Sequence, residues 1–358
     1  MSKLSFELRP VTYALTPPLR TASGTYSTRQ SMLVLARDGD RTGVGEAAPL
    51  ESFGTESYEQ AARMLAQVTD RWEGSKVPRK PEQLAPMFAK LELELERHPA
   101  TAHALECALL DLIAQQDGVP LASLLWRGPY ARAVRVSALI TAGTPEAAAV
   151  QAKEAASAGH DTLKVKVATG PLAQDVQRLE AIRAAVPALK VRIDANGGWT
   201  RQAAEEALRT LAPLDLELCE QPLAADDLEG LVALRRQQFL PIAADESLGL
   251  PNGLERVVAA DAADVLVLKP MVLGGIRRAV DAAGRASKRG VGAYVTSSLE
   301  GPIGRLAALH VAAAIGDRNH AHGLAVGALF GPSARPQLLE PSGGRLSLLD
   351  GPGIGLLD

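Results

Sequence analysis

The chain has 358 residues, of which 47% are hydrophobic and 22% charged, and its formal net charge is only -3. This length can bury a large core and leaves room for two domains, while the small net charge argues against nucleic acid or an anionic membrane surface as a partner. No stretch reaches the roughly 20 apolar residues of a membrane span, and the first ten residues lack a signal-like apolar core, so we expect a cytoplasmic protein that binds a small molecule.

The first region is expected to be an α+β domain over residues 1–125. Residues 1 to about 50 alternate between apolar and polar side chains around a turn at Asp38-Gly39-Asp40, as in an antiparallel meander. The spacing becomes helical over residues 57–67 and 81–97, and a long apolar helix is predicted from Thr101 to Gln116.

Strands and helices alternate from Val134 onward, which predicts parallel strands joined by crossover helices. Eight strands in so short a region favour an α/β fold of the closed (β/α) barrel type, a modified TIM barrel, over residues 126–332. After this, residues 333–358 lose the periodicity, and we expect them to return to the first domain. The predicted strands are Val134–Ile140, Thr162–Val167, Lys190–Asp194, Leu216–Glu220, Pro241–Asp245, Val265–Leu268, Gly292–Ser297 and His322–Ala325.

Three acids, Asp194, Glu220 and Asp245, close successive predicted strands and recur about every 25 residues, the length of one strand, one helix and their loops. One such acid alone could cap the following helix. Neighbouring strands lie about 4.8 Å apart, so three carboxylates at successive strand ends can converge on one hard cation. With no Cys or His among them, Mg²⁺ is favoured over zinc, and Mn²⁺ is possible. Glu246 follows directly, and spacing does not decide which of the two neighbouring acids is the ligand.

Lysines occupy equivalent strand ends. Lys164 and Lys166 are two residues apart and therefore face the same side of one strand, and Lys269 closes a strand farther along the barrel. Lysines spaced in this way can simply protect an edge strand, but a closed barrel has no edges. Beside a dication their pKa would fall towards the range of a general base. Asn196 is a candidate to contact the substrate or to support a metal ligand.

A dication between lysines on opposite faces suits removal of a proton next to a carboxylate, because it stabilises the resulting enediolate. The motifs resemble, in order and spacing, those of the muconate lactonizing subgroup of the enolase superfamily. The resemblance extends to Gly45–Leu50 and Ala104–Leu112 in the first domain. The motifs are Lys164-Val165-Lys166, Asp194-Ala195-Asn196, Glu220-Gln221-Pro222, Asp245-Glu246-Ser247 and Lys269-Pro270.

This resemblance implies roles for each position. Asp194, Glu220 and Asp245 would be the Mg²⁺ ligands, Lys166 the base and Lys269 the residue on the opposite face. Lys164 would lower the pKa of the base and contact the substrate carboxylate. It also implies that residues 1–125 cap the barrel mouth with two loops, roughly 20–28 and 52–56.

The reaction is a narrower question, because the subgroup includes cycloisomerases, dipeptide epimerases, N-acylamino acid racemases and o-succinylbenzoate synthases. The usual Asp-x-Asp pair of dipeptide epimerases is missing from residues 322–328, and Ala328 stands where cycloisomerases usually have Glu. Residues 269–275 and 297–304 look most like the o-succinylbenzoate synthases, which act in menaquinone biosynthesis. The candidate substrate contacts are Asn196, Ser297, Ser298, Glu300 and Gly274.

Two other interpretations stay open. An N-succinylamino acid racemase or dipeptide epimerase would use Lys166 and Lys269 in turn, one on each face of the substrate. The second interpretation is a non-catalytic barrel that retains the metal site for binding or structure. The sequence leaves the oligomeric state undecided, and a homo-oligomer is possible.

Overall fold

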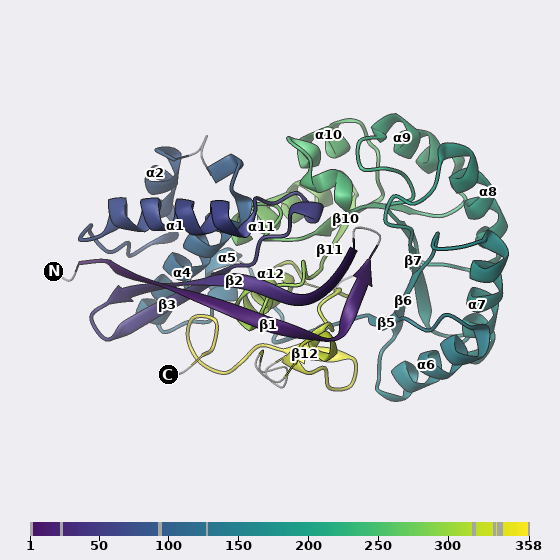
Figure 1. Ribbon diagram of the computed structural model, residues 1–358, viewed down its shortest axis with the longest axis horizontal. Helices are drawn as coiled ribbons and strands as arrows, with labels where there is room; N and C mark the ends of the chain where they lie inside the picture. Colours follow the sequence, from purple (N-terminus) through teal and green to yellow (C-terminus); the bar gives the residue numbers. More distant parts are fainter. Residues whose placement is uncertain are drawn as a thin grey trace.

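The structure is a computed structural model and describes residues 3–21, 24–91, 95–126, 128–316, 320–331, 334 and 339–356. The chain forms a β-rich part that carries the N-terminus and a ring of strands and helices beside it (Figure 1). None of the helices in these ranges combines the length and the apolar character that crossing a bilayer demands.

The predicted N-terminal meander is confirmed. Strands β1 (Ser5–Thr21), β2 (Gly24–Asp38) and β3 (Arg41–Ala47) form an antiparallel sheet in sequence order. Helix α4 (Pro99–Asp117) packs so closely on β3 that a Cβ at Gly45 would lie 2.0 Å from the carbonyl oxygen of Ala104. The sheet therefore needs glycine at this contact.

Two long helices, α1 (Tyr58–Trp72) and α4, and several short ones complete this part. A capping box between Ser57 and Gln60 starts α1, and Pro99 at the first turn starts α4 two residues before the predicted Thr101. The other pieces are η1 (Glu51–Phe53), η2 (Pro81–Gln83), α2 (Leu84–Ala89) and α5 (Leu121–Leu125).

The α/β barrel fold is also confirmed. Seven strands form one parallel sheet in the order β11-β10-β9-β8-β7-β6-β5, and Figure 1 shows the sheet curling with helices α6 to α9 on its outer side. The strands are β5 (Ala138–Ile140), β6 (Thr162–Lys166), β7 (Lys190–Asp194), β8 (Cys219–Glu220), β9 (Ile242–Ala244), β10 (Val265–Leu268) and β11 (Gly292–Val295).

Helices follow the strands in alternation. They are α6 (Pro145–Ser157), α7 (Leu172–Ala185), α8 (Arg201–Leu211), α9 (Leu228–Gln237), α10 (Gly253–Ala259), α11 (Ile276–Ser287) and α12 (Pro302–Ile315), with 3-10 turns η3 (Ala212–Leu214), η4 (Glu246–Gly249) and η5 (Gly327–Leu329).

The barrel is closed by single bridges instead of the predicted eighth strand, residues 322–325. His322 bridges Val136 and Gly323 bridges Thr296, both in parallel orientation. The first predicted strand is also divided. Its start forms β4 (Ala133–Arg135), which pairs antiparallel with β12 (Arg345–Ser347), and only its end joins the barrel sheet as β5.

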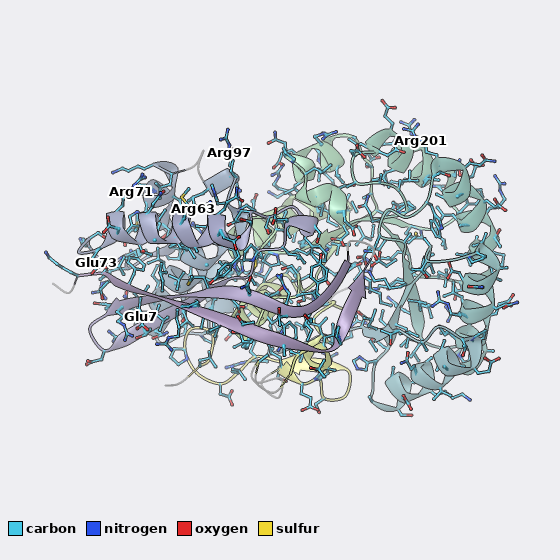
Figure 2. All side chains as sticks on the ribbon, viewed as in Figure 1. Glu7, Arg63, Arg71, Glu73, Arg97 and Arg201 are labelled. Atoms are coloured by element: carbon cyan, nitrogen blue, oxygen red, sulfur yellow. The ribbon has the colours of Figure 1, made fainter. Side chains whose placement is uncertain are left out.

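The C-terminal residues run back to the first part of the chain. The Ile354 amide donates to Asp111 Oδ1 on α4 over 2.8 Å, and the Leu121 amide donates to the carbonyl of Gly353 over 2.7 Å. Figure 2 shows the charged side chains of Arg97 and Arg201 at the upper edge of the molecule, as expected for solvated faces.

Candidate active site

The site lies where the barrel strands end. Lys166 pairs in register with Asp194, and Asp194 with Glu220, so these residues stand side by side at the carboxyl edge of the sheet. Because side chains alternate along a strand, the residues two positions earlier also point into the barrel. Leu218, Ala243 and Val267 belong to the small apolar cluster that fills it, and each precedes a site residue by two positions.

Two lysines contact the acids of β7 and β8. Lys164 Nζ lies 2.7 Å from both carboxylate oxygens of Glu220 and 2.8 Å from Asp194 Oδ2. Lys166 Nζ lies 2.7 Å from the same Asp194 oxygen and also donates to Asn196 Oδ1. Glu220 and Asp194 are fully buried, whereas the Lys166 side chain is 41% exposed. Lys166 is thus the site lysine that is open to a ligand.

Lys269 approaches from the other side of the acid row. Its Nζ lies 2.6 Å from Asp245 Oδ2 and 4.4 Å above the ring centre of Phe53, which η1 brings from the N-terminal part. Strands β6 and β10 are separated by β7, β8 and β9, which places Lys166 and Lys269 across the barrel mouth from each other. A small pocket beside Lys269 is lined by Phe53, Leu248, Val267, Val272 and Leu273 together with Asp245 and Glu246.

The Asn196 side chain links Lys166 to Glu246. Its amide nitrogen donates to Glu246 Oε1 over 2.9 Å while its oxygen accepts from Lys166. Glu246 Oε2 is buried and has no hydrogen-bond partner among the described residues. A buried carboxylate oxygen without a donor is costly, and Glu246 Oε2 is therefore available to a cationic or donor group.

The charges of the site act strongly on one another. Burial lowers the pKa of Lys164, but the carboxylates of Asp194 and Glu220 outweigh burial and raise it well above its ordinary value. The carboxylates next to Lys164 thus favour its charged form. Burial raises the pKa of Glu220 and of Asp245, and Asp194 raises that of Glu220 further. Glu220 thus senses the charges of both Asp194 and Asp245, whereas the charges of Lys164 and Lys166 outweigh burial and hold the pKa of Asp194 well below its ordinary value.

These residues fit a divalent oxygen-binding cation. The described residues contain no group of three or more His, Cys, Asp or Glu side chains arranged around a common point, since lysines contact the carboxylates. The donor chemistry is nevertheless that of a magnesium site: buried carboxylates on adjacent strands and an unpartnered Glu246 oxygen. Asp194, Glu220 and Asp245 are the residues that could hold such an ion.

The other predicted substrate contacts have structural partners. Ser297 Oγ accepts from the Leu299 amide over 3.0 Å, and both the amide and the hydroxyl of Ser298 donate to Glu300 Oε2. These groups are buried after β11. A Cβ on Gly274 would meet Pro99 of α4 and Arg278 of α11, and the Gly274 amide donates to the Met271 carbonyl over 3.3 Å.

Sequence reasoning missed Tyr294 and Phe53. The Tyr294 hydroxyl donates to Glu220 Oε2 over 2.7 Å from inside the barrel. Alternation along the predicted strand 292–297 could have placed Tyr294 in the lumen. The family resemblance placed residues 52–56 at the barrel mouth, but it did not single out Phe53 as the residue over Lys269, because this contact depends on how the first part packs on the barrel. Of the predicted lid loops, Ser52 and Phe53 lie in η1, and Ala22 and Ser23 of the other loop lie outside the described residues.

Comparison with known proteins identifies the family. A family model described as "Enolase C-terminal domain-like" matches residues 147–357, and one described as "MenC, N-terminal domain" matches residues 21–112. The chain is 33% identical to the L-Ala-D/L-Glu epimerase of Bacillus subtilis, over 87% of this chain and 85% of that protein. It is 28% identical to the N-succinyl-L-Arg/Lys racemase of Bacillus cereus, over 84% and 82%.

A third relative, the o-succinylbenzoate synthase of Thermobifida fusca, is 42% identical over 57% of this chain and 63% of its own length. Among solved structures, the dipeptide epimerase of Enterococcus faecalis in complex with Mg and L-Leu-L-Tyr superposes with a TM-score of 0.86. It is 28% identical, and the match covers 99% of each chain. The chain therefore belongs to the enolase superfamily, among enzymes of the mandelate racemase and muconate lactonizing type.

Proposed function

We propose that this chain is a Mg²⁺-dependent enzyme that removes the proton next to a substrate carboxylate. The observation that carries the proposal is the opposition of Lys166 and Lys269 across a row of three buried acids. In this assignment Asp194, Glu220 and Asp245 hold the ion, which supplies positive charge for the substrate carboxylate as the proton leaves.

Lys166 is proposed to be the base. Its amine is the most exposed of the three lysines, and its contacts with Asp194 and Asn196 aim it from β6 towards the mouth. Lys164 is 15% exposed and lies deeper, against Glu220. It is therefore suited to set the charge around the base and to contact the substrate carboxylate at its edge.

For the specific reaction, we propose that of an o-succinylbenzoate synthase. Lys166 would take the α proton of the hydroxylated cyclohexadiene carboxylate, and the ring would aromatise as the C–O bond to the hydroxyl group breaks. The proton held by Lys166 would then pass to the departing hydroxide, which leaves as water. The ammonium of Lys269 already lies over the aromatic face of Phe53 beside apolar side chains, an environment suited to a flat ring. The match to the MenC N-terminal model and the 42% identity to a synthase support this choice.

A racemase of N-acylated amino acids is the second candidate, because it needs a base on each face and this chain has lysines on both. The likeness to the N-succinyl-L-Arg/Lys racemase favours it. A dipeptide with a free ammonium group fits less well. Residues 320–331, which follow the barrel after β11, contain no Asp or Glu that would pair with an ammonium group.

The test is to assay the purified protein with Mg²⁺ against the o-succinylbenzoate precursor, N-succinylamino acids and a panel of dipeptides. The proposal predicts the highest kcat/KM for the precursor. Highest efficiency with N-succinylamino acids, with exchange of the α hydrogen for solvent deuterium in both enantiomers, would replace the synthase assignment by the racemase. Absence of turnover with every carboxylate substrate would contradict the enzymatic role.

A further inference from the structure

A column of polar side chains runs through the barrel below the candidate metal site. It starts at Glu220, whose Oε2 accepts the Tyr294 hydroxyl over 2.7 Å. The guanidinium of Arg192 stacks on the Tyr294 ring at 4.4 Å from its centre. Arg192 in turn pairs with Glu217 at 2.7 Å, and His320 Nδ1 lies 3.1 Å from the other Glu217 oxygen. The family resemblance of the sequence motifs does not involve Tyr294, Arg192, Glu217 or His320.

Every member of this column is held in place. Arg192 is fully buried and also donates to the carbonyl of Ala321 over 3.0 Å, which ties it to the closing segment of the barrel. Tyr294 is 1% exposed, and its ring contacts both the Arg192 guanidinium and the His320 ring, whose centre is 6.1 Å away. Burial and these two contacts restrict the ring and with it the position of its hydroxyl.

The hydroxyl differs from the other donors to Glu220. Lys164 contacts both Glu220 oxygens but carries a positive charge, which repels a dication at the same carboxylate. Tyr294 is a neutral donor, so it can orient the carboxylate without adding charge to the site. Neutral groups that hydrogen-bond to a metal ligand from outside fix its orientation and raise metal affinity.

We propose that Tyr294, clamped by Arg192, is a positioning residue that orients Glu220 and thereby sets how tightly the site binds a divalent cation. The inference rests on the proposed function only in taking Glu220 as a metal ligand. It adds a determinant of metal affinity inside the barrel, on strands β7 and β11, away from the face that the substrate reaches.

The test is a calorimetric titration with Mg²⁺ alone, repeated with Mn²⁺ by electron paramagnetic resonance, on the wild-type protein and Tyr294→Phe. Loss of the hydroxyl is expected to weaken binding by about 10- to 100-fold. Tyr130→Phe is the matched control, because it removes a hydroxyl from a half-buried tyrosine on the loop before β4, outside the barrel. Its affinity should equal that of the wild type.

A merely structural role would lower the unfolding midpoint of Tyr294→Phe but leave the metal affinity of the folded protein within about twofold, and that result overturns the inference.

Glu220→Gln separates the proposed ligand role of Glu220 from the positioning role of Tyr294. If it leaves metal affinity unchanged, the ligand assignment fails; if it abolishes binding while Tyr294→Phe does not weaken it, only the positioning role fails. Arg192→Lys keeps a positive charge for Glu217 but loses the planar stack on Tyr294, and is expected to weaken binding less than Tyr294→Phe. Should Tyr294→Phe not fold, unchanged affinity in Arg192→Lys overturns the inference.

Discussion

Lys166 and Asp194 are register partners on β6 and β7, and the Lys166 ammonium lies 2.7 Å from Asp194 Oδ2. The same carboxylate oxygen is 2.8 Å from Lys164. One acid thus aligns two lysines that leave β6 two residues apart. This shared contact places Lys166, the more exposed of the two, at the barrel mouth, where a substrate would arrive.

Lys166→Ala should abolish proton abstraction. Positioned general bases typically contribute 10²- to 10⁴-fold, so kcat should fall by at least about 100-fold. Stopped assays of product formation at saturating Mg²⁺ measure this, and calorimetry with Mg²⁺ should show that the ion still binds. Lys153→Ala, on the exposed face of α6, is the matched control and should behave as wild type. Retained turnover in Lys166→Ala would remove this residue as the base.

Lys269→Ala distinguishes the two candidate reactions. In a racemase, each lysine removes the proton from one enantiomer, so the variant should still exchange the α hydrogen of one enantiomer of an N-succinylamino acid and lose exchange of the other. In the synthase, Lys269 acts as a cation facing the ring, and the variant should lose turnover of the precursor and should exchange the α hydrogen of neither enantiomer of an N-succinylamino acid. Proton NMR in D₂O with each separate enantiomer gives the answer.

Asp194→Asn should weaken Mg²⁺ binding and activity together, because it removes one of three charged oxygen donors. The change keeps the size of the side chain, and Lys164 and Lys166 still have a hydrogen-bond acceptor. Mg²⁺ affinity is measured by calorimetry and the fold by circular dichroism. Asp226→Asn, in the β8–α9 loop, is a control that should leave affinity unchanged. Wild-type affinity in Asp194→Asn would contradict its role as a ligand.

Glu217 should make folding stability fall in acid. Burial raises its pKa, but hydrogen bonding to His320 and the charge of Arg192 outweigh burial and lower it to about 2. A carboxyl with a lowered folded-state pKa stabilises the fold above its unfolded value, and this stability is lost as pH falls towards 2. The loss is on the order of 3 kcal/mol between about pH 5 and pH 2.

Urea unfolding of the wild type and Glu217→Gln across this pH range checks the effect. The variant should be less stable near neutrality, because Arg192 loses its charged partner inside the barrel. It should also show a flatter dependence on pH. An equal slope in both proteins would contradict the assignment of the acid sensitivity to Glu217.

Much of the fold could be predicted from local pattern. The alternation of residues 1–50 and the strand-helix alternation from Val134 each reflect periodicities that a single sequence displays, and both are confirmed. The last barrel segment could not be predicted correctly. Its residues His322 and Gly323 make only single bridges to two different neighbours, so the segment is defined by the strands beside it.

The candidate site, like the fold, could be predicted from the sequence only in part. The lysines and acids could be proposed because each ends an apolar run and two-residue alternation tells which way it faces. The pKa of Lys164 could not be predicted from local pattern. The carboxylates of Asp194 and Glu220 raise it, and these acids lie on two other strands, β7 and β8. The stack of Arg192 on Tyr294 likewise joins strands far apart in the chain, which no local pattern encodes.

The most direct test of the central claim is proton NMR in D₂O, which detects loss of the substrate's α hydrogen whether the product is aromatised or deuterated. With Mg²⁺, the wild-type protein should remove this signal from the o-succinylbenzoate precursor or from an N-succinylamino acid. Lys166→Ala should leave the signal of the precursor intact and should remove that of an N-succinylamino acid from at most one enantiomer, and the EDTA-treated protein should remove neither. Loss of the signal at the same rate without Lys166, or no loss from any carboxylate substrate, would contradict the account.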